Sequence, residues 1–170
     1  PSNWIAFARF PTWMWRNRET ADFIDWLHGY NTTIPQEARR IGVYGLDLYS
    51  LFTSIDRVLE FLEEHAPECT SIARHRYGCL TPWQSDPAAY GHAAITGKYR
   101  QCAESVATML GDLLDQRLRH LQHDPAGFFD AVQNAQLVVE AERYYRTMYF
   151  GSHPAWNLRD SHMFGTLRAI

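Results

Sequence analysis

Two short runs of the sequence carry charged side chains whose types suit acid–base and electrostatic catalysis. Asp47 directly follows the apolar run Ile41–Leu46, and Arg159 and His162 both lie in the run Trp156–Met163. A carboxylate can orient a histidine or bind a substrate hydroxyl, a guanidinium can stabilise a developing oxyanion, and an imidazole can act as a general acid or base. Asp47, Arg159 and His162 are therefore our candidate catalytic residues.

Each of these candidates also has a purely structural explanation. Asp47 could cap a helix that begins at Leu48, and His162 could simply pack on a helix face. Arg159 is predicted in the first turn of a helix, where a cation opposes the helix dipole, so a carboxylate or an anionic intermediate should compensate it. Asp160 is its neighbour in the sequence, so Arg159 could pair with that carboxylate or remain an ordinary exposed side chain.

Six further side chains are candidates for contact with a substrate: Trp13, Trp15, Arg16, Tyr44, Asn157 and Asp160. Aromatic residues crowd the start of the chain, which is usual for a hydrophobic core but also suits one wall of a pocket for a large apolar ligand. Arg16 could pair with carboxylates of the site, or with Glu19 or Asp22. Asn157 and Asp160 have the spacing of a capping box, which is their structural alternative.

Apolar residues at spacings of three and four predict that most of the chain is helical. The predicted helices span residues 17–28, 48–64, 67–77, 97–121, 126–150 and 157–170. Gly29 is a predicted helix stop, and Asp124 and Pro125 are the predicted N-cap and first position of the fifth helix. On that helix Glu142 faces apolar neighbours and needs a partner, which Arg146 can supply from four residues further on.

The run Ile41–Leu46 is the one convincing strand, because it is short, apolar and β-branched at two positions. Residues 78–91 contain several Pro and Gly residues and are predicted to form an irregular loop. The fold class is therefore mainly α with one strand, in a single partial domain over residues 1–170. Since one strand cannot satisfy its own backbone donors and acceptors, we expect a segment of a larger α/β protein, whose remainder is a partner of this one.

Composition excludes several classes of function. The formal net charge is −3 and no basic face is visible, so we expect no nucleic-acid partner. No apolar run approaches the roughly 20 residues that cross a bilayer, and no signal peptide is recognisable, so we expect a cytoplasmic protein without a membrane partner. Three cysteines without CxxC spacing predict reduced thiols and no zinc site. We expect no cofactor, because phosphate-binding loops and a GxSxG elbow are absent.

Four segments, in this order and at these spacings, closely resemble the erythromycin esterase family. They are Arg9–Asn17, Gly42–Ser50, Gln133–Ala135 with Ala141–Arg146, and Trp156–Met163. The resemblance covers nearly the whole chain. It implies a three-layer α/β/α fold with a parallel sheet and a helical insertion. It also implies ester hydrolysis, in known cases of the macrolactone of an antibiotic, by water that a histidine activates without a metal.

The chain departs from the family pattern in two places. Family members carry an upstream E-x-x-H-G-like run and a downstream H-N-x-H-like run, and neither occurs in this sequence. Those runs resemble the source of the catalytic base, so we expect this chain to be inactive alone and the substrate to be a bulky apolar ester or lactone. The alternatives are a helical ligand-binding or interaction module without chemistry, and a purely structural fragment.

Overall fold

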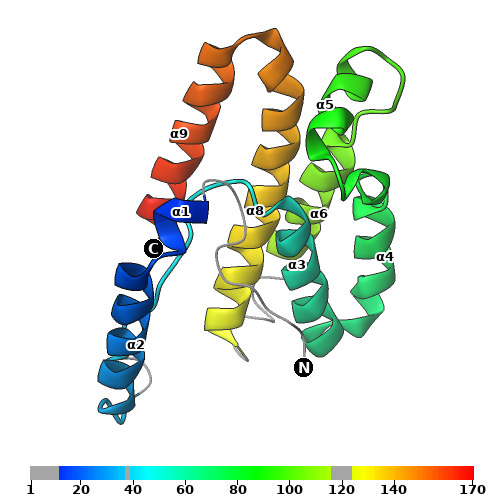
Figure 1. Cartoon of the computed structure of the whole chain (residues 1–170). Helices are drawn as coiled ribbons and strands as arrows, with labels where there is room; N and C mark the ends of the chain where they lie inside the picture. The colour runs from blue at the N-terminus through cyan, green and yellow to red at the C-terminus, as the bar shows by residue number, and fades with distance from the viewer. Residues whose placement is uncertain (1–11, 37–38, 116–123) are drawn as a thin grey trace. The chain divides into compact units, whose positions relative to one another are not determined.

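The computed structural model describes residues 12–36, 39–115 and 124–170, and these are mainly helical (Figure 1). The chain divides into two compact units, the first ending at Gly45 and the second running from Leu46 to Ile170. No strand is present among the described residues. None of their helices is both long enough and apolar enough to cross a membrane.

Within its described residues, the first unit contains the α-helices α1 (Thr12–Trp15) and α2 (Arg18–Thr32). Asn17 begins α2 as its N-cap, because its Oδ1 accepts a hydrogen bond of 2.8 Å from the backbone N–H of Thr20. The predicted stop at Gly29 is wrong, since the helix continues through that residue for three more positions. A glycine inside a helix only weakens it, and Asn31, near the end of α2, forms contacts that anchor the following segment.

The aromatic side chains of this unit are not a buried core. Trp13 and Trp15 of α1 are exposed, and so are Phe23, Trp26 and Tyr30 of α2. The last three follow one another along the helix, with ring centroids 5.9 Å and 5.8 Å apart. The interpretation of this group as core is therefore wrong for the described residues, while the aromatic residues of the first eleven positions lie outside them.

The predicted buried strand over Ile41–Leu46 is also wrong. These residues have no regular secondary structure, and the side chains of Ile41 and Val43 are 48% and 67% exposed. A strand exists only through hydrogen bonds to a neighbouring strand, and the described residues supply none. Instead the side-chain amide of Asn31 bonds both backbone groups of Ile41, donating to its C=O and accepting from its N–H at 2.9 Å each.

The second unit is a bundle built around one long helix, α8 (Figure 1). α8 contacts α3, α5, α6 and α9, while α4 packs against α3 and α6. The bounds are α3 (Leu51–His65), α4 (Pro67–Tyr77), η2 (Thr81–Trp83), α5 (Pro87–Ile95), α6 (Ala103–Asp115), α8 (Pro125–Thr147), η3 (Met148–Phe150) and α9 (Ser152–Ala169). Of the helices predicted here from apolar spacing, those at 48–64, 67–77, 126–150 and 157–170 are thus confirmed, with changed bounds. The helix predicted over 97–121 is confirmed over Ala103–Asp115 only, because residues 97–102 are not helical and 116–121 lie outside the described residues.

α3 shows how the sequence pattern produces this packing. Its apolar residues Leu51, Ile55, Val58 and Leu62 recur at three- and four-residue spacing and are all buried. They form one face that packs against α8 and α4. Each large aliphatic side chain on such a face contributes about 1.5–3 kcal/mol when it is buried. The whole face therefore stabilises the fold far more than a single helix cap does.

Two helix starts differ from the prediction. Residues 78–91 are not an irregular loop, because η2 and the start of α5 lie there, and the Asp86 carboxylate caps α5 by accepting from Ala89 N–H at 3.1 Å. α9 starts at Ser152 and not at Asn157, so Asn157 and Asp160 lie inside the helix and the capping-box interpretation is wrong. By contrast, the predicted cap at residue 124 is confirmed, with a hydrogen bond of 2.9 Å to the backbone three residues on.

A disulfide joins Cys79 to Cys102. The expectation that every cysteine is reduced is therefore wrong for these two residues. Spacing in the sequence could not reveal the pair, because the two cysteines are 23 positions apart and only the folding back of α5 between them brings their Cα atoms to 6.0 Å.

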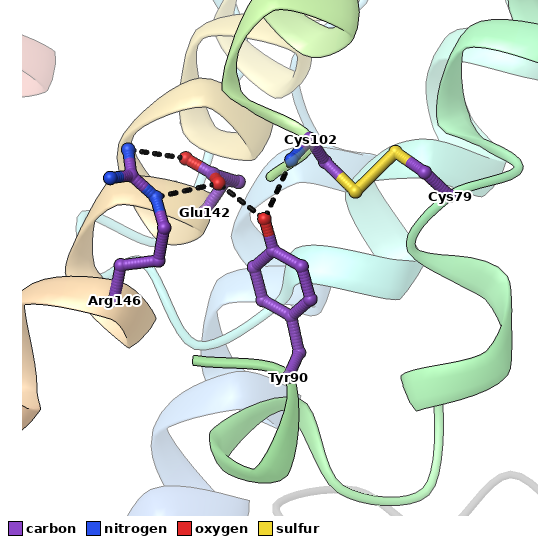
Figure 2. A network of polar contacts seen from close by, with 5 residues as sticks. All are labelled: Cys79, Tyr90, Cys102, Glu142 and Arg146. Carbon is purple, nitrogen blue, oxygen red and sulfur yellow. Dashed lines mark hydrogen bonds and ion pairs between the residues drawn. A yellow bond between two sulfur atoms is a disulfide. The ribbon is translucent and has the colours of Figure 1, made fainter. Parts of the chain in front are cut away.

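A buried polar network crosses the core next to this disulfide (Figure 2). The Glu142 carboxylate accepts two hydrogen bonds from Arg146, at 2.8 Å and 3.0 Å, which confirms the predicted partner. The Tyr90 hydroxyl donates to the same carboxylate at 2.5 Å and accepts from the backbone N–H of Cys102 at 2.8 Å. Since Tyr90 and Glu142 are fully buried, the network ties α5 and the start of α6 to α8.

Replacing Glu142 with alanine should lower the free energy of unfolding by about 3 kcal/mol. The change leaves the buried Tyr90 hydroxyl without its acceptor and the partly buried Arg146 guanidinium without its counter-charge. Urea unfolding followed by circular dichroism measures this loss. Glu142→Gln is the matched control, because it keeps an oxygen acceptor for Tyr90 and should be destabilised less. A Glu142→Ala protein as stable as the wild type would contradict the structural role of the network.

Candidate functional site

The structure brings Asp47 and Arg159 together from positions 112 residues apart. Arg159 Nε donates to Asp47 Oδ1 at 2.9 Å, and Nη2 donates to Oδ2 at 2.6 Å. This two-bond arrangement fixes the guanidinium plane relative to the carboxylate. The pair joins two of the sequence runs that resembled one family, and both of its residues belong to the second unit.

Neither member of the pair has the helix-terminal role considered from the sequence. Asp47 Oδ1 accepts a bond of 2.9 Å from the N–H of Leu48, but α3 starts only at Leu51, so Asp47 is not its N-cap. Arg159 lies past the first turn of α9, so the argument from the helix dipole is wrong. Its carboxylate partner is Asp47 and not the sequence neighbour Asp160, which is exposed.

Three aromatic residues complete the group that we call the Arg159 cluster: Asp47, Tyr49, Tyr144, Trp156 and Arg159. The Arg159 Cζ lies 5.1 Å from the ring centroid of Tyr49 and 5.3 Å from that of Trp156. The Tyr49 and Tyr144 hydroxyls are 3.2 Å apart, and their rings meet edge to face. Sequence reasoning gave no role to the three aromatic residues, although each lies in one of the family-like runs.

The charges of the cluster are stable over a wide pH range. Burial alone would raise the pKa of Asp47, but the hydrogen bonds from Arg159 and from Leu48 N–H outweigh it, so that pKa is lowered. The hydrogen bonds to Asp47 raise the pKa of Arg159. Burial, together with the hydrogen bond to Tyr49, raises the pKa of Tyr144 to about 12. At neutral pH the cluster therefore holds the Asp47 carboxylate, the Arg159 guanidinium and a protonated Tyr144.

This arrangement can present hydrogen-bond donors to an oxygen atom of a ligand. Arg159 uses Nε and Nη2 for Asp47, and no described residue accepts a hydrogen bond from Nη1. The Arg159 side chain is 22% exposed, so part of it reaches solvent. A fixed guanidinium edge can stabilise a carbonyl oxygen on which negative charge develops.

His162 lines a groove between α8 and α9, helices that run alongside each other (Figure 1). The groove has a volume of about 660 Å³. Its lining is mostly polar and comprises Gln133, Gln136, Glu140, Arg143, Thr147, Pro154, Asn157, Leu158, Ser161, His162, Gly165, Thr166 and Ala169. His162 is only 7% exposed and makes no hydrogen bond with another described residue, so nothing in this part of the chain orients its ring.

Burial lowers the pKa of His162, against the opposing charges of Glu140 and Asp47. A histidine with a lowered folded-state pKa destabilises the fold once the unfolded chain begins to bind its proton, near pH 6.5. The free energy of unfolding should therefore fall as the pH drops from 7.5 to 5.5, and His162→Gln should reduce this fall. Urea titrations at both pH values measure it, and an equal fall in the two proteins would contradict the assignment.

Four of the predicted contact residues belong to the other unit of the chain. Trp13, Trp15, Arg16 and Tyr44 belong to the first unit and are exposed there. Arg16 makes no ion pair with Glu19 or Asp22 among the described residues. Their approach to the Arg159 cluster stays a prediction.

Two predicted contact residues lie on α9 itself. Asn157 is exposed and lines the groove, and Asp160 is exposed outside it. Among the described residues, no three His, Cys, Asp or Glu side chains are grouped so that they could hold a metal ion.

The sequence of the chain was compared with models of known protein families and with solved structures. The family model described as erythromycin esterase matches residues 2–170. No solved structure matches the chain.

Proposed function

Because the chain belongs to the erythromycin esterase family, we propose that it forms part of a carboxylic-ester hydrolase. The observation that carries this proposal is the two-bond pairing of Arg159 with Asp47, which places two motif runs at one point and leaves the Nη1 group without a hydrogen-bond acceptor among the described residues. Fixed donors of this kind are what acyl transfer requires, since negative charge develops on the carbonyl oxygen in the transition state.

In the proposed reaction a water molecule adds to the carbonyl carbon of an ester or lactone. The bond from that carbon to the alkoxy oxygen then breaks, and the products are a carboxylic acid and an alcohol, which remain one molecule if the substrate is a lactone. Arg159 donates hydrogen bonds to the carbonyl oxygen, and Asp47 holds the guanidinium in place. A histidine outside these residues takes the proton of the attacking water, and no metal takes part.

We propose a bulky, largely apolar substrate such as a macrolactone. The exposed aromatic side chains Trp13 and Trp15 of the first unit and Trp156 of α9 support this choice, because large aromatic surfaces bind large apolar ligands. We also propose that the two units are the helical part of a three-layer α/β/α fold, which is the finer fold that the family resemblance implies.

A cytoplasmic location belongs to the same proposal. Cys79 and Cys102 are both buried, and burial protects a disulfide from the thiol reductants that make such bonds rare in that compartment. Alkylation of the protein at the moment of cell lysis, followed by mass spectrometry, distinguishes the oxidised from the reduced pair.

A second candidate is a helical ligand-binding module without catalysis. The groove between α8 and α9 favours it, because its volume of about 660 Å³ lies in the range of small-molecule sites. In that case a ligand would bind and be released unchanged.

The test is to incubate the complete protein that contains these residues with a macrolactone and with simple aryl esters. The lactone should gain the mass of one water molecule, and the esters should release acid and alcohol, at rates that EDTA does not change. Binding of the lactone without any mass gain would favour the binding module. A rate that EDTA abolishes and zinc restores would overturn the metal-independent mechanism.

A further inference from the structure

We propose that Tyr49 and Trp156 are positioning residues for Arg159, which fix its guanidinium so that the N–H donors not used by Asp47 meet the substrate carbonyl oxygen. This inference rests on the proposed function and extends it to residues outside the Asp47–Arg159 pair. Its first evidence is geometric, since both rings lie within the range of about 6 Å over which an aromatic ring attracts a cation.

Asp47 alone restrains Arg159 incompletely. The two hydrogen bonds define the edge through which the guanidinium is held. These bonds still allow the guanidinium to move together with the Asp47 carboxylate. Asp47 precedes α3, and its side chain is 36% exposed. Rings close to the guanidinium carbon restrict the movements that the hydrogen bonds permit. Asp47, Tyr49 and Trp156 therefore constrain different movements of the same group.

The two rings are themselves anchored by different parts of the second unit. Tyr49 lies two residues after Asp47, and its hydroxyl shares a hydrogen bond of 3.2 Å with Tyr144 of α8. Trp156 lies on α9, three residues before Arg159, and so on a neighbouring turn of the same helix. The contacts of the cluster therefore hold Arg159 in place relative to α8, α9 and the turn before α3.

Charge balance makes position more important than charge at this site. Asp47 compensates the charge of Arg159, so the pair attracts free anions weakly. What remains is a set of directed N–H donors, whose effect on a reaction depends on their placement near the oxygen. We therefore expect that loosening the guanidinium lowers the turnover number more than the affinity for substrate.

The first test follows the Arg159 side chain directly in the 170-residue protein. The Nε–H group of an immobilised arginine gives a sharp signal in a ¹H–¹⁵N spectrum, and loss of that signal in Arg159→Lys assigns it. Tyr49→Leu and Trp156→Leu should each broaden or remove the signal, while Tyr49→Phe and Trp156→Phe should retain it. Trp156 is 57% exposed, so its replacement should leave the core intact.

A matched control exists on the same helix. Phe164 lies 5.9 Å from Arg168 in the same kind of contact, so Phe164→Leu should leave the Arg159 signal unchanged. An Arg159 signal that stays sharp in both Tyr49→Leu and Trp156→Leu would overturn the proposal, and so would equal broadening in the Phe164→Leu control.

The second test measures ester hydrolysis by the complete protein. The two Leu variants should lower kcat about ten-fold or more with little change in KM, and the Phe variants should restore it. If the Leu variants lose the sharp Arg159 signal but keep the wild-type kcat, the positioning role is overturned. If the wild-type protein hydrolyses no ester, the proposed function fails, while the spectra still decide whether the rings immobilise Arg159.

Discussion

Replacing Arg159 with alanine in the complete protein should lower kcat for ester hydrolysis by about 10²–10³-fold. The variant removes the donors that we place next to the developing oxyanion, and these act mainly in the transition state. KM should change far less than kcat for the same reason. Steady-state rates with an aryl ester, whose product is followed by absorbance, measure both constants.

Two variants control this experiment. Arg168→Ala removes an exposed arginine from the same helix and should keep the wild-type rate. Arg159→Lys keeps the positive charge but loses the two-bond fork to Asp47, so its rate should fall between those of wild type and alanine. Circular dichroism should be unchanged throughout, because the pair is partly exposed and contributes little to stability. A wild-type rate for Arg159→Ala would end the oxyanion proposal.

The 170-residue chain by itself should hydrolyse the same esters about 10²–10⁴-fold more slowly than the complete protein, because that range is the contribution of general-base catalysis. Arg159 can polarise a carbonyl group but cannot take a proton from water at neutral pH. Among the described residues, His162 is the candidate base nearest to this site in the sequence. Burial keeps it neutral, but no hydrogen bond orients it.

The comparison uses equal molar amounts of the two proteins, with heat-denatured chain as the background. His162→Ala in the 170-residue chain is the informative variant. Turnover by the chain that matches the complete protein, and that His162→Ala abolishes, would show that we have assigned the catalytic base to the wrong part of the protein. A slow rate that the variant leaves unchanged is the expected result.

Local rules predicted the helices well where a single interaction decides the start of the helix. Asp124 with Pro125 is such a case, since one side chain caps the helix and the next fits its first position. The apolar stripe of α3 is another, because its spacing determines which face can be buried. These features depend on residues close in the sequence, and so the sequence pattern is sufficient.

The start of α5 was wrongly predicted as an irregular loop because residues 78–91 contain several glycines and prolines. Gly91 suggested a loop, but a Cβ atom there would lie 1.9 Å from the backbone oxygen of Tyr145. The glycine therefore permits α5 to pack directly against α8, a requirement that exists only in the folded chain. Gly151, by contrast, does separate two helices. Its positive φ of 127° ends η3 and lets α9 begin at the next residue, Ser152.

The charged residues of the candidate site were predicted, but the direct contacts between them were not. Asp47 and Arg159 were identified by their chemistry and their motifs, yet the partner considered for Arg159 was its sequence neighbour Asp160. Side chains 112 residues apart meet only through the packing of α8, α3 and α9, and no local rule reports that packing. Tyr49 and Trp156 were missed for the same reason.

The claim that Asp47 and Arg159 act as one unit is tested most directly by a double-mutant cycle in the complete protein. The measurement is kcat/KM for ester hydrolysis by wild type, Asp47→Ala, Arg159→Ala and the variant that carries both changes. If Asp47 acts by holding Arg159, the double variant should be no slower than Arg159→Ala alone. Two losses that multiply in the double variant would show that the residues act independently, and would contradict this account of the site.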